Sequence, residues 1–375
     1  MKAVRSFISE RLNSRLEDNS LRSLKTNSPL VDFCSNDYLG FSRSLELKQL
    51  FETQLARYPE YKLGSTGSRL LTGNDQFTET VEAGIAQFHN SEASLLFNSG
   101  YDANVGLFSS LPQRGDTIIC DEYIHASIID GARLSHAARF VFKHNDMDSL
   151  EQKLKAAQGK IFIGVESVYS MDGDEAPLKE ISNLAEKYNA ALIVDEAHAI
   201  GVFGDHGKGI VEALNLSEKV FARIVTYGKA LGVHGAAILG SDDLRSYLIN
   251  FARSFIYTTA PSFLTNLAIK TSYDYLQTKN HQQDLQLRIS HFRSKVDSLP
   301  GLAKSRSGIQ IILIPGNTKV KEIASRMQQE DFDVRAILSP TVSPGFERLR
   351  ICLHNHNSLT EIEALCQSLK FHCES

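Results

Sequence analysis

The side chains best placed for chemistry in this sequence follow short apolar runs. The run Ala191–Val194 ends in Asp195, with His198 one helical turn later, and the run Arg223–Val225 leads into Lys229 in a glycine-rich turn. A lysine in a dry site loses its charge more easily and can then attack an aldehyde. A lysine and an aspartate at strand ends therefore suit pyridoxal phosphate (PLP), because the lysine can bond to the cofactor while the carboxylate keeps the pyridine nitrogen protonated. The simpler alternative is an Asp that caps a helix beside a surface His.

A nucleotide-binding protein is a second interpretation of the same region. An apolar run that ends in Asp-Glu-Ala-His also occurs in the magnesium-binding box of helicase-type ATPases, which need the motif G-x-x-x-x-G-K-[ST] upstream. None of three Gly-Lys pairs fits that motif: Gly159-Lys160, Gly207-Lys208 and Gly228-Lys229. A dinucleotide loop of the form G-x-G-x-x-G fails as well, because Glu212 stands where a third glycine would have to follow Gly207 and Gly209. Both nucleotide-binding classes are therefore disfavoured.

Three more apolar runs lead into residues that suit the same cofactor. Asn98–Tyr101 is a glycine turn that opens a helix, where backbone N–H groups can bind a phosphate. His125 stands just past the run Thr117–Cys120, where an imidazole could lie on the face of a planar ring, although a capping or core histidine is the alternative. The segment Glu166–Asp174 supplies hydroxyl groups at another strand end, or is a plain turn.

The elements that must position these residues alternate between strand and helix, which indicates an α/β fold. The runs are continuously apolar, as in strands covered on both faces, and they predict a large, mostly parallel sheet. Open sheets of this kind bind ligands beyond the carboxyl ends of their strands. The seven runs are Ser94–Phe97, Thr117–Cys120, Arg139–Phe142, Ile161–Val165, Ala191–Val194, Arg223–Val225 and Ala236–Leu239.

The length of 375 residues predicts two or three structural units. We expect an N-terminal arm over residues 1–42, a large cofactor-binding domain over 43–260, and a linking helix with a small α+β domain over 261–375. The helical stretch should run from about Pro261 to Leu299. The small domain is predicted from four segments: Ile309–Ile314, Lys319–Glu330, Glu347–Leu353 and Leu359–Leu369.

Composition and charge limit the class of partner. There are 40 Lys and Arg against 44 Asp and Glu, and a net charge of −4 argues against nucleic acid or an anionic membrane as the main partner. The five cysteines include no Cys-x-x-Cys pair, so no metal site is expected and we interpret them as reduced thiols in the cytoplasm. No run approaches the roughly 18 apolar residues of a membrane span.

Together these residues resemble the α-oxoamine synthase family of fold-type I PLP enzymes, and the resemblance covers nearly the whole chain from Ser35 to Arg350. Two segments are most similar to the branch of the family that acts in biotin biosynthesis, namely Gly232–Ala237 and Phe255–Ala260. Further matching segments are Ser35–Gly40, Gly64–Arg69, Thr258–Ala260 and Pro340–Val342.

The resemblance implies a role for each site residue. It implies that Lys229 bonds to the cofactor, Asp195 faces the pyridine nitrogen, His198 lies near the ring hydroxyl and His125 stacks on the ring. Further cofactor contacts would come from Gly100, Tyr101, Ser170, Thr226, Thr258 and Thr259. Thr258 or Thr259 would reach the phosphate of the neighbouring subunit, which implies a homodimer with shared active sites. Substrate contacts would come from Arg22, Asn36, His125, Thr341 and Arg350.

The implied reaction is the decarboxylative condensation of L-alanine with a pimeloyl thioester, on coenzyme A or a carrier protein, to 8-amino-7-oxononanoate, CO2 and free thiol. Sibling reactions stay open, because glycine C-acetylation, 5-aminolevulinate synthesis and serine palmitoylation would use the same catalytic residues. A binding protein that kept the fold and lost activity is expected to have lost Lys229 or Asp195, and both are present.

Overall fold

The computed structural model describes residues 1–18, 20–24, 26 and 29–374. The chain divides into two compact units, which are described one at a time. The large unit comprises residues 36–286 and 354–356, and the small unit comprises residues 1–35, 287–353 and 357–375. The expected division into residues 1–42, 43–260 and 261–375 stays a prediction.

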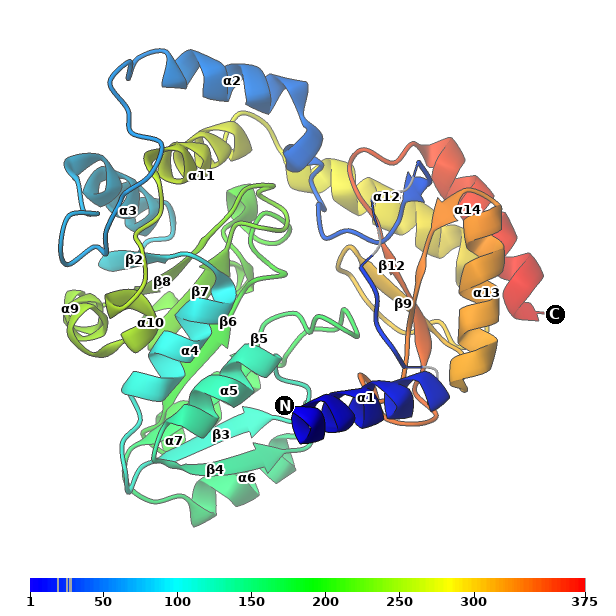
Figure 1. The fold of residues 1–375 in the computed structure, drawn as a ribbon, viewed down its shortest axis with the longest axis horizontal. Helices are drawn as coiled ribbons and strands as arrows, with labels where there is room; N and C mark the ends of the chain where they lie inside the picture. Colours follow the sequence, from blue (N-terminus) through cyan, green and yellow to red (C-terminus); the bar gives the residue numbers. More distant parts are fainter. Residues whose placement is uncertain (19, 25, 27–28, 375) are drawn as a thin grey trace. The chain divides into compact units, whose positions relative to one another are not determined.

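The large unit is built on a seven-stranded sheet with the strand order β2-β8-β7-β6-β5-β3-β4 (Figure 1). Within this sheet β8 runs antiparallel to both of its neighbours, and the remaining pairs are parallel. The predicted α/β fold with a mostly parallel sheet is confirmed. The strands are β2 (Ala93–Phe97), β3 (Thr117–Asp121), β4 (Ala138–Phe142), β5 (Ile161–Glu166), β6 (Ala191–Asp195), β7 (Ala222–Thr226) and β8 (Ala236–Gly240).

Helices cover both faces of this sheet, because successive side chains of a strand point to opposite sides. On β6, Ile193 packs into one hydrophobic cluster while Leu192 and Val194 pack into the other. Each such fully buried side chain contributes about 1.5–3 kcal/mol. One cluster is closed by α4 (Gly100–Ser110), α5 (Ala126–Leu134), α9 (Asp242–Phe251) and α10 (Arg253–Ile256), and the other by α6 (Met147–Ala156), α7 (Leu178–Lys187) and α8 (Ile210–Ala213).

Strand β4 departs from the expectation that every run is covered on both faces. Its Phe142 is buried, but Val141 is 57% exposed. The reason is position, since β4 lies at the edge of the sheet and pairs with β3 alone. A continuous apolar run therefore does not distinguish an edge strand from a central one.

The expected helical stretch from Pro261 to Leu299 forms two helices, α11 (Phe263–Leu276) and α12 (His281–Val296). The hydroxyl of Ser262 accepts a hydrogen bond from the Thr265 N–H at 3.2 Å, which caps the first of them. Helix α11 contacts two earlier helices of the large unit, α2 (Leu45–Leu55) and α3 (Gln76–Phe88). Short 3-10 turns lie at Phe41–Arg43, Asp205–Gly207 and Ser217–Lys219.

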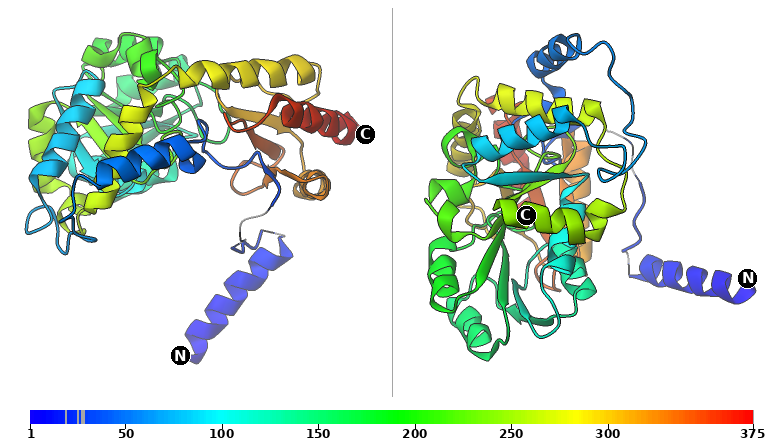
Figure 2. Two further views of the ribbon diagram at one scale, coloured as in Figure 1. Left: turned by 90° about the horizontal axis from the view of Figure 1, so that it is seen from above. Right: turned by 90° about the vertical axis from the view of Figure 1, so that its left-hand side faces the viewer.

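The small unit has the expected α+β character. Its three-stranded antiparallel sheet has the order β11-β12-β9, and β1 pairs with β10 in parallel. Helix α1 (Lys2–Glu17) buries no residue, and Figure 2 shows it apart from the other helices of its unit. The remaining elements are β1 (Val31–Asp32), β9 (Ile309–Leu313), α13 (Asn317–Gln329), β10 (Phe332–Asp333), β11 (Arg335–Ile337), β12 (Arg348–Cys352) and α14 (Leu359–Glu374).

Two general features of the chain complete the fold. All five cysteines lie in the described part of the chain and are free thiols. Among the described helices, none combines the length and the apolar character that crossing a membrane requires.

A partly buried histidine joins the ends of three neighbouring strands of the large unit. The Nδ1 atom of His144 lies 2.9 Å from a carboxylate oxygen of Asp121, and its Nε2 atom lies 2.8 Å from Asp174. The imidazole ring stacks on Tyr123 at a centroid distance of 4.4 Å. Burial alone would lower the pKa of His144, but the hydrogen bonds to both carboxylates outweigh it and raise that pKa to about 10. His144 is therefore a partly buried cation between two carboxyl groups.

The charge on His144 predicts a pH-dependent contribution to stability. Replacing His144 by Gln should lower the free energy of unfolding by about 3 kcal/mol at neutral pH, because both carboxylates lose their cationic partner. Since the pKa rises from 6.5 to about 10 on folding, the stabilisation is complete below pH 6.5 and is lost as the pH rises through about 10. Urea unfolding should therefore show a difference between wild type and variant that is large at neutral pH and small at about pH 11.

The matched control is the exposed His136 in the same unit, whose replacement by Gln should have little effect at either pH. A difference between wild type and the His144 variant that is equal at both pH values would contradict a charged imidazole.

Candidate active site

One cavity of about 310 Å³ lies where the carboxyl ends of the central strands meet the start of α4 in the large unit. It brings together residues that are far apart in the sequence, as the sheet topology requires. Eight of the predicted site residues line it: Asn36, Gly100, Tyr101, His125, Asp195, His198, Thr226 and Lys229.

Asp195 is the last residue of β6, and its side chain is held at both oxygens. Oδ1 accepts a hydrogen bond from the backbone N–H of Ala197 at 2.9 Å, and Oδ2 accepts one from the side-chain amide of Asn104 at 2.8 Å. The residue is only 4% exposed. Two N–H donors on a buried carboxyl give it a fixed direction. This is the arrangement needed to face a protonated pyridine nitrogen.

His125 is connected to Asp195 through two residues for which the sequence predicted no role. Asn104 also donates to the hydroxyl of Ser127 at 3.0 Å, and this hydroxyl lies 2.7 Å from Nδ1 of His125. The backbone N–H of Ser127 donates to the same Nδ1 at 3.2 Å, so Nδ1 is an acceptor and the neutral ring carries its proton on Nε2. Burial is the main cause that lowers the pKa of His125. The charge of Asp195 raises this pKa, and the nearby charge of Lys229 lowers it further. A neutral imidazole results.

His198 is oriented by a tyrosine of the large unit. The hydroxyl of Tyr38 lies 2.7 Å from Nδ1 of His198 and donates to the side-chain oxygen of Asn36 at 3.1 Å. Tyr38 is fully buried, so its hydroxyl is held in place. The matching segment Ser35–Gly40 contains Tyr38 and was the one sequence signal for it, although no role was predicted.

The lysine lies in a tight turn between β7 and β8. The backbone N–H of Gly232 donates to the carbonyl of Lys229 at 2.9 Å, and Val233 donates to Tyr227 at 2.9 Å. Gly232 has φ +67°, and a Cβ there would lie 2.3 Å from the backbone nitrogen of Ser42. Only glycine fits, and this turn directs the partly exposed Lys229 to the cavity.

The start of α4 is suited to a phosphate group. The helix begins at Gly100, where a Cβ would lie 2.6 Å from the Thr226 methyl group, so glycine is needed for the close approach. The hydroxyl oxygen of Thr226 is buried and has no hydrogen-bond partner among the described residues. A buried hydroxyl beside free helix N–H groups can bind an anion. The residues present therefore fit PLP, with phosphate at one end and Asp195 at the other.

Three predicted cofactor residues do not line this cavity. Thr258 and Thr259 are bonded to Asn98, whose side-chain amide donates to the Thr258 hydroxyl at 3.0 Å and to the Thr259 carbonyl at 2.9 Å. Ser170 follows β5, and its backbone N–H donates to the carboxyl group of Glu166. These residues border the site rather than form its wall.

The other three predicted substrate residues belong to the small unit. The guanidinium of Arg22 donates to the hydroxyl of Thr341 at 3.3 Å, and both line a cavity of about 230 Å³ within that unit. Arg350 lies on β12, is buried, and donates to the sulfur of Cys352 at 3.0 Å. Arg22 and Thr341, which lie near opposite ends of the chain, thus meet in this unit, and their role as substrate contacts stays a prediction.

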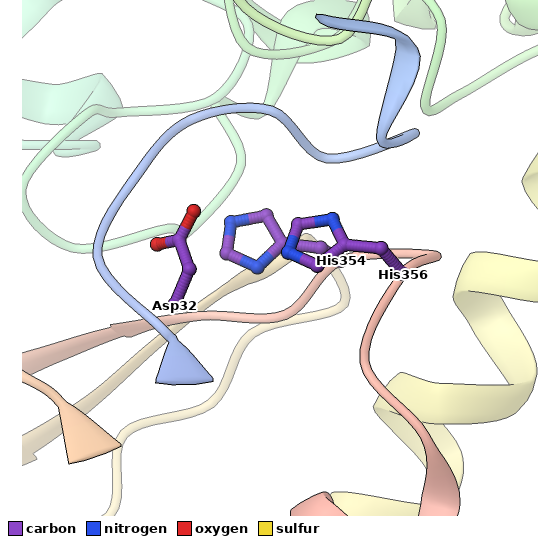
Figure 3. Close-up of side chains that lie close together, drawn as sticks. All are labelled: Asp32, His354 and His356. Carbon is purple, nitrogen blue, oxygen red and sulfur yellow. The ribbon is translucent and has the colours of Figure 1, made fainter. Parts of the chain in front are cut away.

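A histidine pair supports the segment that holds Tyr38. The rings of His354 and His356 stack at a centroid distance of 4.5 Å (Figure 3). Between them, the backbone N–H of Asn355 donates to the carbonyl of Tyr38 at 2.9 Å. The sequence carried no signal for this support, because the partners are more than 300 residues apart.

Comparison with known proteins gives a consistent family. Residues 28–369 match the family model for aminotransferase class I and II. The 8-amino-7-oxononanoate synthase of Emericella nidulans is 42% identical over 98% of this chain and 95% of its own length. The aminoacyl transferase sphA of Byssochlamys spectabilis is 35% identical over 97% of this chain and 87% of its own length.

The comparison with solved structures finds the same fold. Serine palmitoyltransferase from S. paucimobilis, with PLP bound as a myriocin adduct, has a TM-score of 0.87 with 23% identity over 98% of this chain and 96% of that one. At that identity the likeness shows the shared fold. From the family model and the curated relatives, the chain belongs to the aminotransferase class I and II family and, within it, to the α-oxoamine synthases, which are PLP-dependent acyltransferases.

Proposed function

We propose that the chain condenses L-alanine with a pimeloyl thioester to give 8-amino-7-oxononanoate, CO2 and free thiol, as a step of biotin biosynthesis. The acyl carrier is coenzyme A or an acyl carrier protein. The observation that carries the proposal is the convergence of Lys229, Asp195, His125 and His198 on one cavity, in a chain that is 42% identical to a synthase of that name. The free cysteines fit the cytoplasmic location that we propose with it.

The cofactor and the protein have separate tasks in this proposal. Bound PLP supplies an electron sink that makes proton removal and decarboxylation at the amino-acid α-carbon possible. Lys229 would bond to the cofactor, and its free amine would accept the α-proton of the amino acid. Asp195 holds the proton on the ring nitrogen, and the neutral His125 can lie against the ring without adding charge. Phosphate would be held by the N–H groups of Gly100 and Tyr101 with the Thr226 hydroxyl, and the ring hydroxyl by His198.

Substrate contacts are proposed for five residues. Arg350 suits the amino-acid carboxylate, because a guanidinium can donate two parallel hydrogen bonds to it. Asn36 lines the cofactor cavity, and Arg22 and Thr341 line the cavity of the small unit. His125 would contact both cofactor and substrate.

A sibling reaction is the second candidate, and it is favoured by a specific finding. The aminoacyl transferase sphA is also similar over 97% of the chain. The catalytic residues are expected to be the same for glycine, serine and alanine, so the strand-end chemistry does not distinguish among them. Substrate preference must be measured.

An assay of substrate preference tests the proposal, and we expect the highest turnover with L-alanine and pimeloyl thioester. Release of free thiol should be measured with L-alanine, glycine and L-serine, each against pimeloyl-, acetyl-, succinyl- and palmitoyl-CoA and pimeloyl carrier protein. We expect kcat/KM for the L-alanine and pimeloyl pair to exceed every other pair by about 10-fold or more, since the acyl pocket must reject wrong chain lengths. Lys229→Ala is the control and should release no thiol above background. A preference for glycine or L-serine would exclude the biotin-pathway assignment.

We further propose a homodimer in which Thr258 or Thr259 of one subunit completes the cofactor site of the other. The segment 258–260 is joined to the segment 64–69, because Ser65 donates to the Ala260 carbonyl at 2.6 Å and the Ala260 N–H donates to Gly67 at 2.9 Å. Large apolar side chains around this pair of segments are exposed, among them Leu63, Leu70, Leu71 and Tyr257. A second copy of the chain is the partner that would cover them.

Shared sites predict complementation between two inactive variants. One variant carries Lys229→Ala and the other carries both Thr258→Ala and Thr259→Ala. A mixed dimer contains one site with an intact lysine and intact threonines, so random mixing should restore about a quarter of the wild-type turnover. Thiol release after co-expression, compared with each variant alone, measures this. If the mixture stays as inactive as its parents, or if the threonine variant is fully active alone, the sites are not shared.

A further inference from the structure

A second carboxyl group lies at the same edge of the sheet as Asp195. Glu166 is the last residue of β5 and pairs directly with Asp195 in the parallel β5–β6 ladder. It is 2% exposed, and its side chain lines the same cavity as Lys229 and Asp195. The resemblance assigned it no role. Two acidic residues side by side at the ends of buried strands require an explanation, because burying two negative charges together is costly.

The hydrogen bonds around the two carboxyls differ. Both oxygens of Asp195 accept N–H donors. Glu166 accepts from the backbone N–H groups of His125 and Ser170, but its Oε1 is buried without a hydrogen-bond partner among the described residues. A buried carboxylate oxygen without a donor is unfavourable, whereas a protonated oxygen can donate to a group inside the cavity. The unsatisfied atom belongs to a residue of the cavity wall.

The surroundings of Glu166 also favour the protonated state of its carboxyl group. Burial is the main cause that raises the pKa of Glu166 well above its ordinary value, and the charge of Asp195 raises it further. Lys229 and the backbone N–H groups of His125 and Ser170 lower it by less. On the other neighbouring strand, Asp121 is paired with the cationic His144.

We propose that Glu166 stays protonated at neutral pH and is a positioning residue of the cofactor site. One carboxyl oxygen holds the backbone of His125 and of Ser170 in place, and the Oε1–H group donates into the cavity. Asp195 is then the single anionic carboxyl that faces the cofactor's ring nitrogen. The inference rests on the proposed cofactor site but not on the identity of the amino acid or acyl substrate.

The test is a vibrational measurement on the holoenzyme. The infrared spectrum at neutral pH should contain the C=O band of a protonated carboxylic acid, and Glu166→Gln should remove it. Gln keeps the shape, a carbonyl acceptor and an N–H donor, so this variant should retain cofactor. The control is Glu347→Gln, because Glu347 is also buried but accepts N–H groups from Gly316 and Gly345 that lower its pKa. That variant should leave the band unchanged.

A second measurement, the pH dependence of thermal stability, follows from the coupling between proton binding and folding. A carboxyl with a raised pKa in the folded state holds a proton that the unfolded chain releases, so its effect on stability becomes less favourable as pH rises above the ordinary value. The thermal midpoint of the Glu166→Gln holoenzyme should therefore rise relative to wild type by about 2–4 °C between about pH 6 and pH 9. Absence of the band in wild type, or a midpoint difference that does not change with pH, would overturn the proposal. Neither readout depends on turnover, so failure of the substrate assay leaves this inference intact.

Discussion

The two hydrogen bonds accepted by Asp195 are the constraint on which the rest of the site depends. One comes from the backbone of Ala197 and fixes the turn after β6, and the other comes from Asn104 on α4. Because Asn104 also donates to Ser127, which contacts His125, the same amide aligns the imidazole with the carboxylate. One amide group of the fold therefore sets the orientation of both the Asp195 carboxyl and the His125 imidazole.

Parallel strands bring several acidic side chains to one edge, and the structure gives each a different environment. Asp121 is neutralised by the imidazole of His144. Asp195 is held by N–H donors, and Glu166 is buried with one oxygen that has no hydrogen-bond partner among the described residues. These differences give one cation, His144, and one carboxyl that lines the cavity, Asp195. In our proposal they also make Glu166 a neutral acid. In this proposal, negative charge does not accumulate in a dry interior, where two neighbouring charged carboxyls would be costly.

The sheet could be predicted because an apolar run marks each of its strands. The site could be predicted only in part, because contacts between residues far apart in the sequence help to form it. Seven apolar runs indicated all seven strands, but the exposed face of β4 depends on its place at the edge, which no single run records. The roles of Asn104 and Tyr38 come from contacts with residues 91 and 160 positions away. Neither residue type nor spacing marks them, and the motif that contains Tyr38 was visible through resemblance alone. The roles of the predicted cofactor and substrate residues remain predictions.

The central claim is that Lys229, at the end of β7, is the residue that bonds to PLP. Borohydride reduction of the holoenzyme followed by peptide mass spectrometry tests it most directly, because reduction makes the bond between lysine and cofactor permanent. The account predicts the added cofactor mass on the peptide that contains Lys229 and on no other. Modification of a different lysine, such as Lys208, or unmodified Lys229 in a cofactor-loaded protein would contradict it.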